Sequence, residues 1–279
     1  MTVGIVGLGL IGGSLCKAYK ENAPQTRVLG WDLDPKITGI AQIAGVIDGE
    51  LTDERLRECD LILVAIYPQA AIDWILKKAP LFNKDGVVMD CCGVKKKVCD
   101  ACFEAARREG FLFVGGHPMA GSHNAGFKYS RGDLYKGAPM AIVPPCFDDI
   151  DLLERIKRLL LPVGFGKISV TSAEHHDEVI AFTSQMAHVV SNAYVKSPTA
   201  ENHKGFSAGS YKDLTRVAWL SAPMWSELFM ENKDCLLKEL TLFRDNINAY
   251  IEALEKEDGE KLCALLKEGS DIKGRIDGR

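Results

Sequence analysis

Short apolar runs alternate with amphipathic stretches over the first 170 residues of the chain. Apolar runs bounded by Gly and Pro are typical of buried strands, and apolar positions recurring every three to four residues are typical of helices. We predict strands at residues 2–7, 28–32, 60–66, 86–90, 111–115, 139–143 and 167–171, with helices near 11–22, 36–44, 69–80, 95–109 and 148–161. This alternation predicts an α/β domain built on a parallel, doubly wound sheet.

After about residue 172 the pattern becomes almost entirely helical. Ser172, followed by Glu174 and Asp177, is typical of a capped helix start. We therefore predict two domains, an α/β domain over residues 1–171 and an all-α domain over residues 172–279. The run His175-His176-Asp177 at this start predicts helix capping and polar surface rather than a functional site.

One apolar seam follows the helical pattern from about residue 223 to residue 257. Its members, mostly spaced by three or four residues, are Phe229, Leu236, Leu240, Phe243, Ile247, Tyr250 and Leu254. A seam of this length needs a cover, and about a hundred residues of helix offer little surface for one. We expect the same helices of a second copy to cover it, which predicts a homodimer through the helical domain.

Composition narrows the class of protein. A net charge of −4 without a long basic tract gives no case for nucleic acid, and no apolar segment is long enough to predict a membrane span. Nine scattered cysteines and an N-terminus that leads straight into the first strand predict a cytoplasmic protein without a signal peptide. Cys99 and Cys102 form a C-x-x-C inside a predicted helix, without a second pair at zinc spacing, so no metal is predicted.

A glycine pattern stands between the first predicted strand and the first predicted helix. Gly7, Gly9 and Gly12 fit G-x-G-x-x-G, and Asp32 follows at the end of the next strand. This order is typical of a Rossmann-type dinucleotide site, in which the acid accepts hydrogen bonds from the ribose and disfavours a 2′-phosphate. NAD is the expected cofactor, and the residues predicted to bind it are Gly7, Leu8, Gly9, Leu10, Ile11, Gly12, Asp32, Ala65, Ile66 and Tyr67.

Three side chains are candidates for chemistry. His117 follows a predicted strand and is flanked by Gly116 and Pro118, where it can take a proton from a substrate hydroxyl as a hydride leaves. Arg216 follows a glycine-containing loop and is suited to a bidentate contact with a carboxylate. Alternatively, it pairs with Asp213 or is a surface charge. His188 lies on an apolar helix, where a lone histidine is more often a core residue.

These motifs together resemble the prephenate dehydrogenase family of tyrosine biosynthesis, including its arogenate-using relatives. The resemblance covers roughly residues 3–260. It rests on Gly7–Ser14, Asp90–Lys95, Gly116–Ser122, His188, Gly209–Arg216 and Ala222–Trp225. The family oxidatively decarboxylates prephenate to 4-hydroxyphenylpyruvate with NAD, and arogenate, which would give tyrosine directly, is the alternative substrate.

The resemblance implies roles for particular residues. His117 matches the histidine that takes the hydroxyl proton, and Arg216 matches the arginine that holds a substrate carboxylate. His188 matches a substrate-binding histidine. Gly209 matches a glycine near the substrate side chain that can come from the partner subunit, and Trp225 matches a tryptophan near the site.

Three positions depart from the family pattern. Gly93 stands where many members have a serine that orients the substrate and the catalytic histidine. His123 stands where some have glutamate, and Gln185 where some have another histidine, and both are expected near the substrate side chain. Neither supplies the carboxylate that the ammonium group of arogenate would favour, which favours prephenate.

Two other classes compete with this interpretation. β-Hydroxyacid dehydrogenases share the layout but use a K-x-x-x-N pair, whereas Asn192 and Lys196 stand in the reverse order here. The second class is a non-catalytic NAD-binding regulator. Only Gly93 supports this interpretation, and turnover of any substrate would exclude it.

Overall fold

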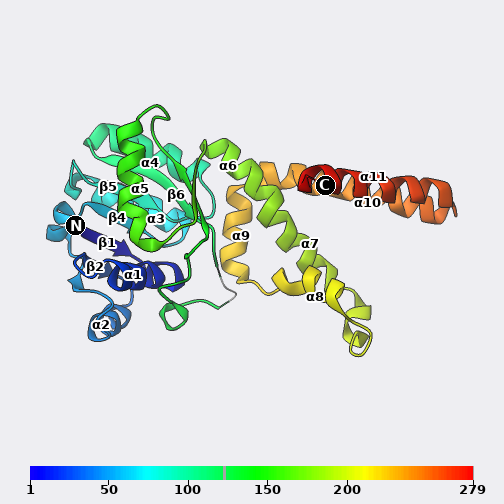
Figure 1. Ribbon diagram of the computed structural model, residues 1–279, viewed down its shortest axis with the longest axis horizontal. Helices are drawn as coiled ribbons and strands as arrows, with labels where there is room; N and C mark the ends of the chain where they lie inside the picture. Colours follow the sequence, from blue (N-terminus) through cyan, green and yellow to red (C-terminus); the bar gives the residue numbers. More distant parts are fainter. Residues whose placement is uncertain (122–123, 279) are drawn as a thin grey trace. The chain divides into compact units, whose positions relative to one another are not determined.

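The computed structural model describes residues 1–121 and 124–278 and divides the chain into two compact units, Met1–Asn232 and Lys233–Arg279. An eight-stranded sheet forms the centre of the first unit, in the order β3-β2-β1-β4-β5-β6-β7-β8. Figure 1 labels β1, β2, β4, β5 and β6 of this sheet. The strands are β1 Thr2–Val6, β2 Arg27–Trp31, β3 Gly49–Glu50, β4 Leu61–Val64, β5 Val87–Asp90, β6 Leu112–Pro118, β7 Pro139–Val143 and β8 Lys167–Val170. The short strand β3 was not predicted.

The pairing of β6 with β7 is antiparallel, whereas the other neighbouring strands are parallel. The predicted parallel, doubly wound sheet is therefore confirmed except at this pair. Residues 119–138 between the two strands hold no α-helix in their described part, only a short 3-10 turn at Phe127–Tyr129. Parallel neighbours need a long crossover, usually a helix, so β7 runs back beside β6 instead.

Helices cover both faces of the sheet, as the doubly wound prediction requires. The helices are α1 Leu10–Asn22, α2 Pro35–Ile43, α3 Pro68–Lys78, α4 Lys96–Glu109 and α5 Ile150–Leu160. Leu15 of α1 and Ile156 of α5 belong to one buried apolar cluster, and Ile75 of α3 and Val98 of α4 belong to a second. Successive residues of one strand point to opposite faces, so Ile5 joins the first cluster and Val6 the second.

The rest of the first unit is helical. It contains α6 Ala173–Ile180, a π-helical turn at Ala181–Met186, α7 Ala187–Tyr194, α8 Gly209–Thr215 and α9 Ala222–Glu231. The 3-10 turns lie at Asp53–Glu58, Ala79–Leu81, Phe127–Tyr129, Leu161–Val163, Pro198–Asn202 and Arg216–Ala218. The predicted cap of α6 is confirmed, because Ser172 Oγ accepts a hydrogen bond of 3.1 Å from His175 N.

The second unit consists of two helices, α10 Lys233–Glu255 and α11 Gly259–Asp277. The apolar seam was predicted on one helix from residue 223 to residue 257, but α9 ends before Asn232 and α10 begins after it. The side chain of Asn232 instead donates hydrogen bonds of 2.8 Å to Asp177 O and to Gln185 Oε1. The domain boundary near residue 172 stays a prediction. Among the described residues, no helix combines the length and the apolarity that crossing a membrane requires.

Candidate active site

The glycine loop joins β1 to α1 at the carboxyl edge of the sheet. Gly7 has a φ of +83°, and a Cβ at this residue would lie 2.4 Å from Ile66 Cγ2. A Cβ at Gly12 would lie 1.8 Å from Gly7 O, whereas a Cβ at Gly9 would meet no atom within 4 Å. Two of the glycines therefore permit the turn and the close packing, and Gly9 leaves space open in front of the helix.

The surroundings of this space suit a dinucleotide. Gly9 precedes α1 and offers no side-chain cap, so the first N–H groups of the helix are available to an anion. Asp32 lies beyond β2 and accepts hydrogen bonds from Leu8 N at 2.7 Å and from Asp34 N at 3.0 Å. Its carboxylate is thereby held beside the loop, where a ribose can donate to it.

The other residues predicted to bind the cofactor border the same loop. Leu10 and Ile11 form the first turn of α1, and Ala65, Ile66 and Tyr67 connect β4 to α3. Leu8 itself is fully buried and packs in the core of the sheet domain, whereas Tyr67 is exposed. The structure thus gathers the predicted cofactor residues at one loop and one neighbouring strand end.

His117 lies near the end of β6, at the same carboxyl edge, and is partly buried. Its Nδ1 is 2.9 Å from His176 Nε2. Burial, then the neighbouring His176 and the positive Lys95, hold the pKa of His117 well below its ordinary value of 6.5. A Cβ at Gly93 would lie 4.0 Å from His117 Nε2, so this nitrogen faces the position where the family serine is missing.

A buried ion pair fixes the backbone beside His117. Lys95 and Asp90 are both fully buried and form a salt bridge. Lys95 Nζ also donates to Gly116 O at 2.5 Å, and Asp90 Oδ1 accepts from Gly116 N at 3.0 Å. Burial lowers the pKa of Lys95, but the charge and hydrogen bond of Asp90 together with the neighbouring Cys92 and Cys99 outweigh burial, so the pKa is raised. The peptide preceding His117 is thus held from both sides.

His176 and Asp177 were predicted to be capping and surface residues, and this prediction is wrong. Both are buried, and His176 Nδ1 is 2.7 Å from Asp177 Oδ1. Their burial follows from the helical period, because Ala173, His176, Asp177 and Ile180 share one face of α6. Apolar residues at both ends of this face were the signal in the sequence.

A second cluster holds the other substrate-binding candidates. His188 lies on α7, its Nδ1 donates to Ser184 O at 2.9 Å, and its ring stacks on Trp225 with centroids 3.9 Å apart. Burial is the main cause that lowers the pKa of His188, and the charge of Arg216 lowers it further. Arg216 and His188 are therefore near neighbours.

Arg216 was predicted to follow a glycine-containing loop, but helix α8 lies directly before it and ends at Thr215. Its guanidinium is exposed and borders a hollow of about 500 Å³ together with Lys212, Asp213, Thr215 and Trp219. Within residues 1–121 and 124–278 it forms no ion pair, with Asp213 or with any other carboxylate. The charge is thus available to a ligand.

Helix α9 borders both clusters. Trp225 and Leu228 are three residues apart on it and so share a face. Trp225 stacks on His188, and a Cβ at Gly93 would lie 3.6 Å from Leu228 Cδ2. The environment of Arg216 therefore adjoins that of His117 through one turn of α9.

The remaining candidates differ in their surroundings. Gly209 is exposed at the first residue of α8. Gln185 is buried, with its Nε2 donating to Leu228 O at 3.2 Å and its Oε1 accepting from Asn232. Its amide supports α9 from behind. His123 lies outside the described residues.

The cysteines show no arrangement for metal or redox chemistry. In the part of the chain that the structure describes, no cluster of three or more His, Cys, Asp or Glu side chains is placed to hold a metal ion. Cys99 and Cys102 are buried in α4, and burial raises the pKa of the Cys102 thiol to about 12. All nine cysteines are free thiols.

Comparisons with known proteins give the family. The model of the prephenate dehydrogenase nucleotide-binding domain matches residues 15–169, and that of the prephenate dehydrogenase dimerization domain matches residues 172–268. The chain belongs to the prephenate dehydrogenase family. A prephenate dehydrogenase of Bacillus subtilis (strain 168) is 30% identical over 280 residues, which cover 98% of this chain and 75% of the relative.

Two further family relatives extend nearly over the whole chain. A cyclohexadienyl dehydrogenase of Zymomonas mobilis is 29% identical and covers 95% of this chain and 92% of its own. A crystal structure of prephenate dehydrogenase from A. aeolicus in complex with hydroxyphenyl propionate and NAD+ superposes with a TM-score of 0.83 at 29% identity. That superposition covers 99% of this chain and 98% of the other.

Proposed function

We propose that this protein catalyses the NAD-dependent oxidative decarboxylation of prephenate to 4-hydroxyphenylpyruvate in tyrosine biosynthesis. One observation carries the proposal: His117 Nε2 lies toward the space beside Gly93, at the sheet edge that also holds the glycine loop. Burial holds the pKa of His117 well below 6.5, which favours the neutral base. A base and a nicotinamide at one edge suit removal of a proton and a hydride from one alcohol carbon. Family membership counts against the β-hydroxyacid interpretation, and turnover of prephenate would exclude the regulator interpretation.

NAD, when bound, supplies the acceptor for the hydride that leaves ring C4. His117 Nε2 accepts the proton of the C4 hydroxyl as that carbon is oxidised. The ring carboxylate then leaves as carbon dioxide, and the electrons of its bond to the ring flow to the oxygen at C4. The phenolate oxygen recovers the proton, so His117 ends the cycle neutral and no net proton is released. Aromatisation drives the reaction, and the residues chiefly supply alignment.

Arg216, His188 and Trp225 form the substrate-binding side of the proposal. An unpaired guanidinium holds a carboxylate strongly, and stacking on Trp225 fixes the ring of His188 near it. Arg216 holds its carboxylate equally in the ground state and the transition state, so it serves binding more than rate. Gly209, His123 and Gln185 remain predicted to lie around the substrate side chain.

A second candidate substrate is arogenate. Asp213 borders the same hollow as Arg216 and supplies a carboxylate that the ammonium group of arogenate would pair with. The preference between prephenate, which has a keto side chain, and arogenate, which has an amino side chain, thus depends on whether the substrate side chain lies beside Asp213. We propose prephenate as the main substrate, since none of the residues matched to the family's side-chain contacts is acidic.

The first experiment follows NADH absorbance with purified protein, NAD and either prephenate or arogenate, and repeats it with NADP. We expect turnover with prephenate and NAD. His117→Asn should lower kcat by about 10²- to 10⁴-fold, because it removes the base. Arg216→Ala should raise KM for prephenate by about 10- to 100-fold with a smaller change in kcat. Exchange of these two effects, or turnover of arogenate alone, would contradict the assignment.

We also infer a homodimer and a cytoplasmic location. The match of residues 172–268 to a dimerization domain supports the dimer. Nine free thiols, six of them buried, support a reducing compartment.

A further inference from the structure

A second histidine lies directly behind His117. His176 is 4% exposed, and its ring bridges His117 Nδ1 at 2.9 Å and Asp177 Oδ1 at 2.7 Å. The base is on strand β6, and its two partners are on helix α6. None of the motifs that identify the family-like site includes this pair.

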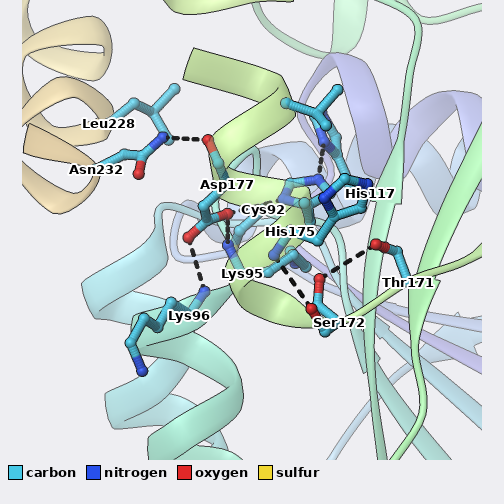
Figure 2. Close-up of polar contacts among 12 residues, drawn as sticks. Cys92, Lys95, Lys96, His117, Thr171, Ser172, His175, Asp177, Leu228 and Asn232 are labelled. Carbon is cyan, nitrogen blue, oxygen red and sulfur yellow. Dashed lines mark hydrogen bonds and ion pairs between the residues drawn. The ribbon is translucent and has the colours of Figure 1, made fainter. Parts of the chain in front are cut away.

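Asp177 is anchored at the start of α4. Its Oδ1 accepts from Lys95 N at 2.7 Å and its Oδ2 from Lys96 N at 2.9 Å, as Figure 2 shows. Asn232 Nδ2 also donates to Asp177 O. Backbone N–H groups at a helix N-terminus stabilise an anion, so the carboxylate is held charged and in one orientation.

This anchoring determines which ring nitrogens carry hydrogen. A carboxylate only accepts hydrogen bonds, so His176 Nδ1 must carry a hydrogen and donate it to Asp177. The neutral ring of His176 then has a lone pair at Nε2, and His117 Nδ1 must donate to it. His117 is left with its lone pair at Nε2, the nitrogen nearest the added Cβ position at Gly93.

We propose that His176 and Asp177 are positioning residues, which hold His117 as the tautomer with a free Nε2 and stabilise the charge that it acquires. The inference rests on the proposed function. When His117 Nε2 gains the hydroxyl proton, the Nδ1–H bond strengthens toward His176 Nε2. The positive charge is thereby directed through the second ring toward Asp177. When the proton returns to the product, both rings are again neutral.

The charged neighbours make this arrangement matter. The titratable groups around the two histidines and Asp177 come from β5, α4, the connection between them, and α9. They are Asp90 of β5, Cys92 and Lys95 of the connection, Lys96 and Cys99 of α4, and Glu231 of α9. Burial, the neighbouring His176 and Lys95 all oppose a positive charge on His117. Asp177, acting through His176, places negative charge on the side of His117 Nδ1. This charge offsets the unfavourable effects only when His117 is protonated.

The test compares His176→Gln and Asp177→Asn with two matched controls. His175→Gln replaces the exposed neighbouring histidine, and Glu174→Gln replaces an exposed carboxylate on the same turn of α6. We expect the first two variants to lower kcat for prephenate by at least about 10-fold, with KM for NAD and prephenate within about twofold. The acid limb of kcat should move in both, and both controls should match the wild type.

A second measurement does not depend on turnover. Nitrogen-15 NMR of ring-labelled wild-type protein should show His117 and His176 as Nδ1–H tautomers, with His117 shifting to a mixture in Asp177→Asn. A wild-type His117 protonated at Nε2, or wild-type kcat and pH profile in His176→Gln, would overturn the proposal. If the wild type fails to turn over prephenate, the proposed function fails, whereas the NMR measurement still decides the tautomer.

Discussion

At the scale of single residues, His117 is prepared as a base by the groups around it. Burial is the main cause that lowers its pKa from the ordinary value of 6.5, and His176 and Lys95 lower it further. A base must be unprotonated to act, and a depressed pKa keeps His117 neutral throughout the physiological range.

The first prediction concerns pH. Protonated His117 cannot accept the hydroxyl proton, so the acid limb of kcat/KM should fall at a pH below 6.5. Stability should follow the same group. An unfolded chain binds a proton on His117 near pH 6.5 and the folded chain only at lower pH, so the free energy of unfolding falls as pH drops below 6.5.

Urea unfolding between pH 7.5 and pH 5 measures the second effect. Each proton taken up on unfolding contributes up to about 1.4 kcal/mol per pH unit. His117→Gln removes the proton that His117 takes up on unfolding. The free energy of unfolding of this variant should therefore depend less steeply on pH than that of the wild type. An equal slope in both proteins would show that His117 titrates normally in the folded state. His188, whose pKa is also lowered, contributes in both and cancels in the comparison.

At the scale of elements, the glycines of the loop between β1 and α1 serve two different purposes, close packing of the protein and space for a ligand. Gly12 permits the contact between α1 and the strand-end loop, where a Cβ would meet Gly7 O at 1.8 Å. Gly9 is free of protein atoms within 4 Å of an added Cβ and borders only the space left for phosphate. Substitutions at the two positions should therefore affect different properties.

The second prediction uses this difference. Gly9→Ala should raise the Kd for NAD by at least about 10-fold while urea unfolding changes little, because the methyl group occupies ligand space. Gly12→Ala should lower the free energy of unfolding by about 1–3 kcal/mol and also weaken NAD binding, because α1 must shift. Calorimetric titration with NAD and urea unfolding give the two quantities.

Gly39→Ala serves as the control. Gly39 is exposed inside α2 and has no atom within 4 Å of an added Cβ. Alanine there should leave NAD affinity unchanged and stabilise the protein by up to about 1 kcal/mol. Loss of stability in Gly9→Ala equal to that in Gly12→Ala would contradict the assignment of the two glycines.

Most elements could be predicted from the sequence because each carries a local signal. Except for β6, which ends three residues beyond its predicted end, the strands longer than two residues and the five sheet-covering helices lie within two residues of their predicted bounds. The reversal at β7 could not be recognised, because strand direction depends on the connection and not on the strand's own residues. The break between α9 and α10 at Asn232 could not be predicted either, because the apolar seam keeps its spacing across it. The contact of Asn232 with Asp177 O depends on the tertiary fold.

The site shows the same division. His117 and the glycine loop are local motifs and stand where they were predicted. His176 and Asp177 have side chains common at helix starts, so their types suggested a cap and concealed a buried pair. Arg216 was a candidate from its sequence context and from the resemblance. That it forms no ion pair within residues 1–121 and 124–278 depends on which side chains the fold brings beside it, and the sequence alone does not give these.

At the scale of the whole molecule, the two-helix unit is too small to bury its own apolar side chains. Leu237 is 64% exposed, Leu242 52% and Leu254 62%. Leu237 and Leu242 border one hollow on α10 together with Thr241. Exposed apolar surface of this kind indicates an interaction surface, and the family match assigns the segment to dimerization.

The third prediction is that Leu242→Glu weakens the dimer. A buried, unpaired carboxylate opposes association, so the variant should sediment as a monomer at concentrations at which the wild type is a dimer. Arg244→Glu adds the same side chain about 200° around the helix and is the control. Sedimentation velocity distinguishes the species, and an unchanged dimer in Leu242→Glu would place the interface elsewhere.

The hydrogen bond between His117 and His176 also bears on how this protein can change over evolutionary time. The base belongs to the segment matched by the nucleotide-binding model, and its partner to the segment matched by the dimerization model. A recombination event at the predicted boundary would therefore join a base to a foreign helix and leave its Nδ1 without a designated acceptor. The two segments match separate family models, but the hydrogen bond between His117 and His176 requires that they be retained together.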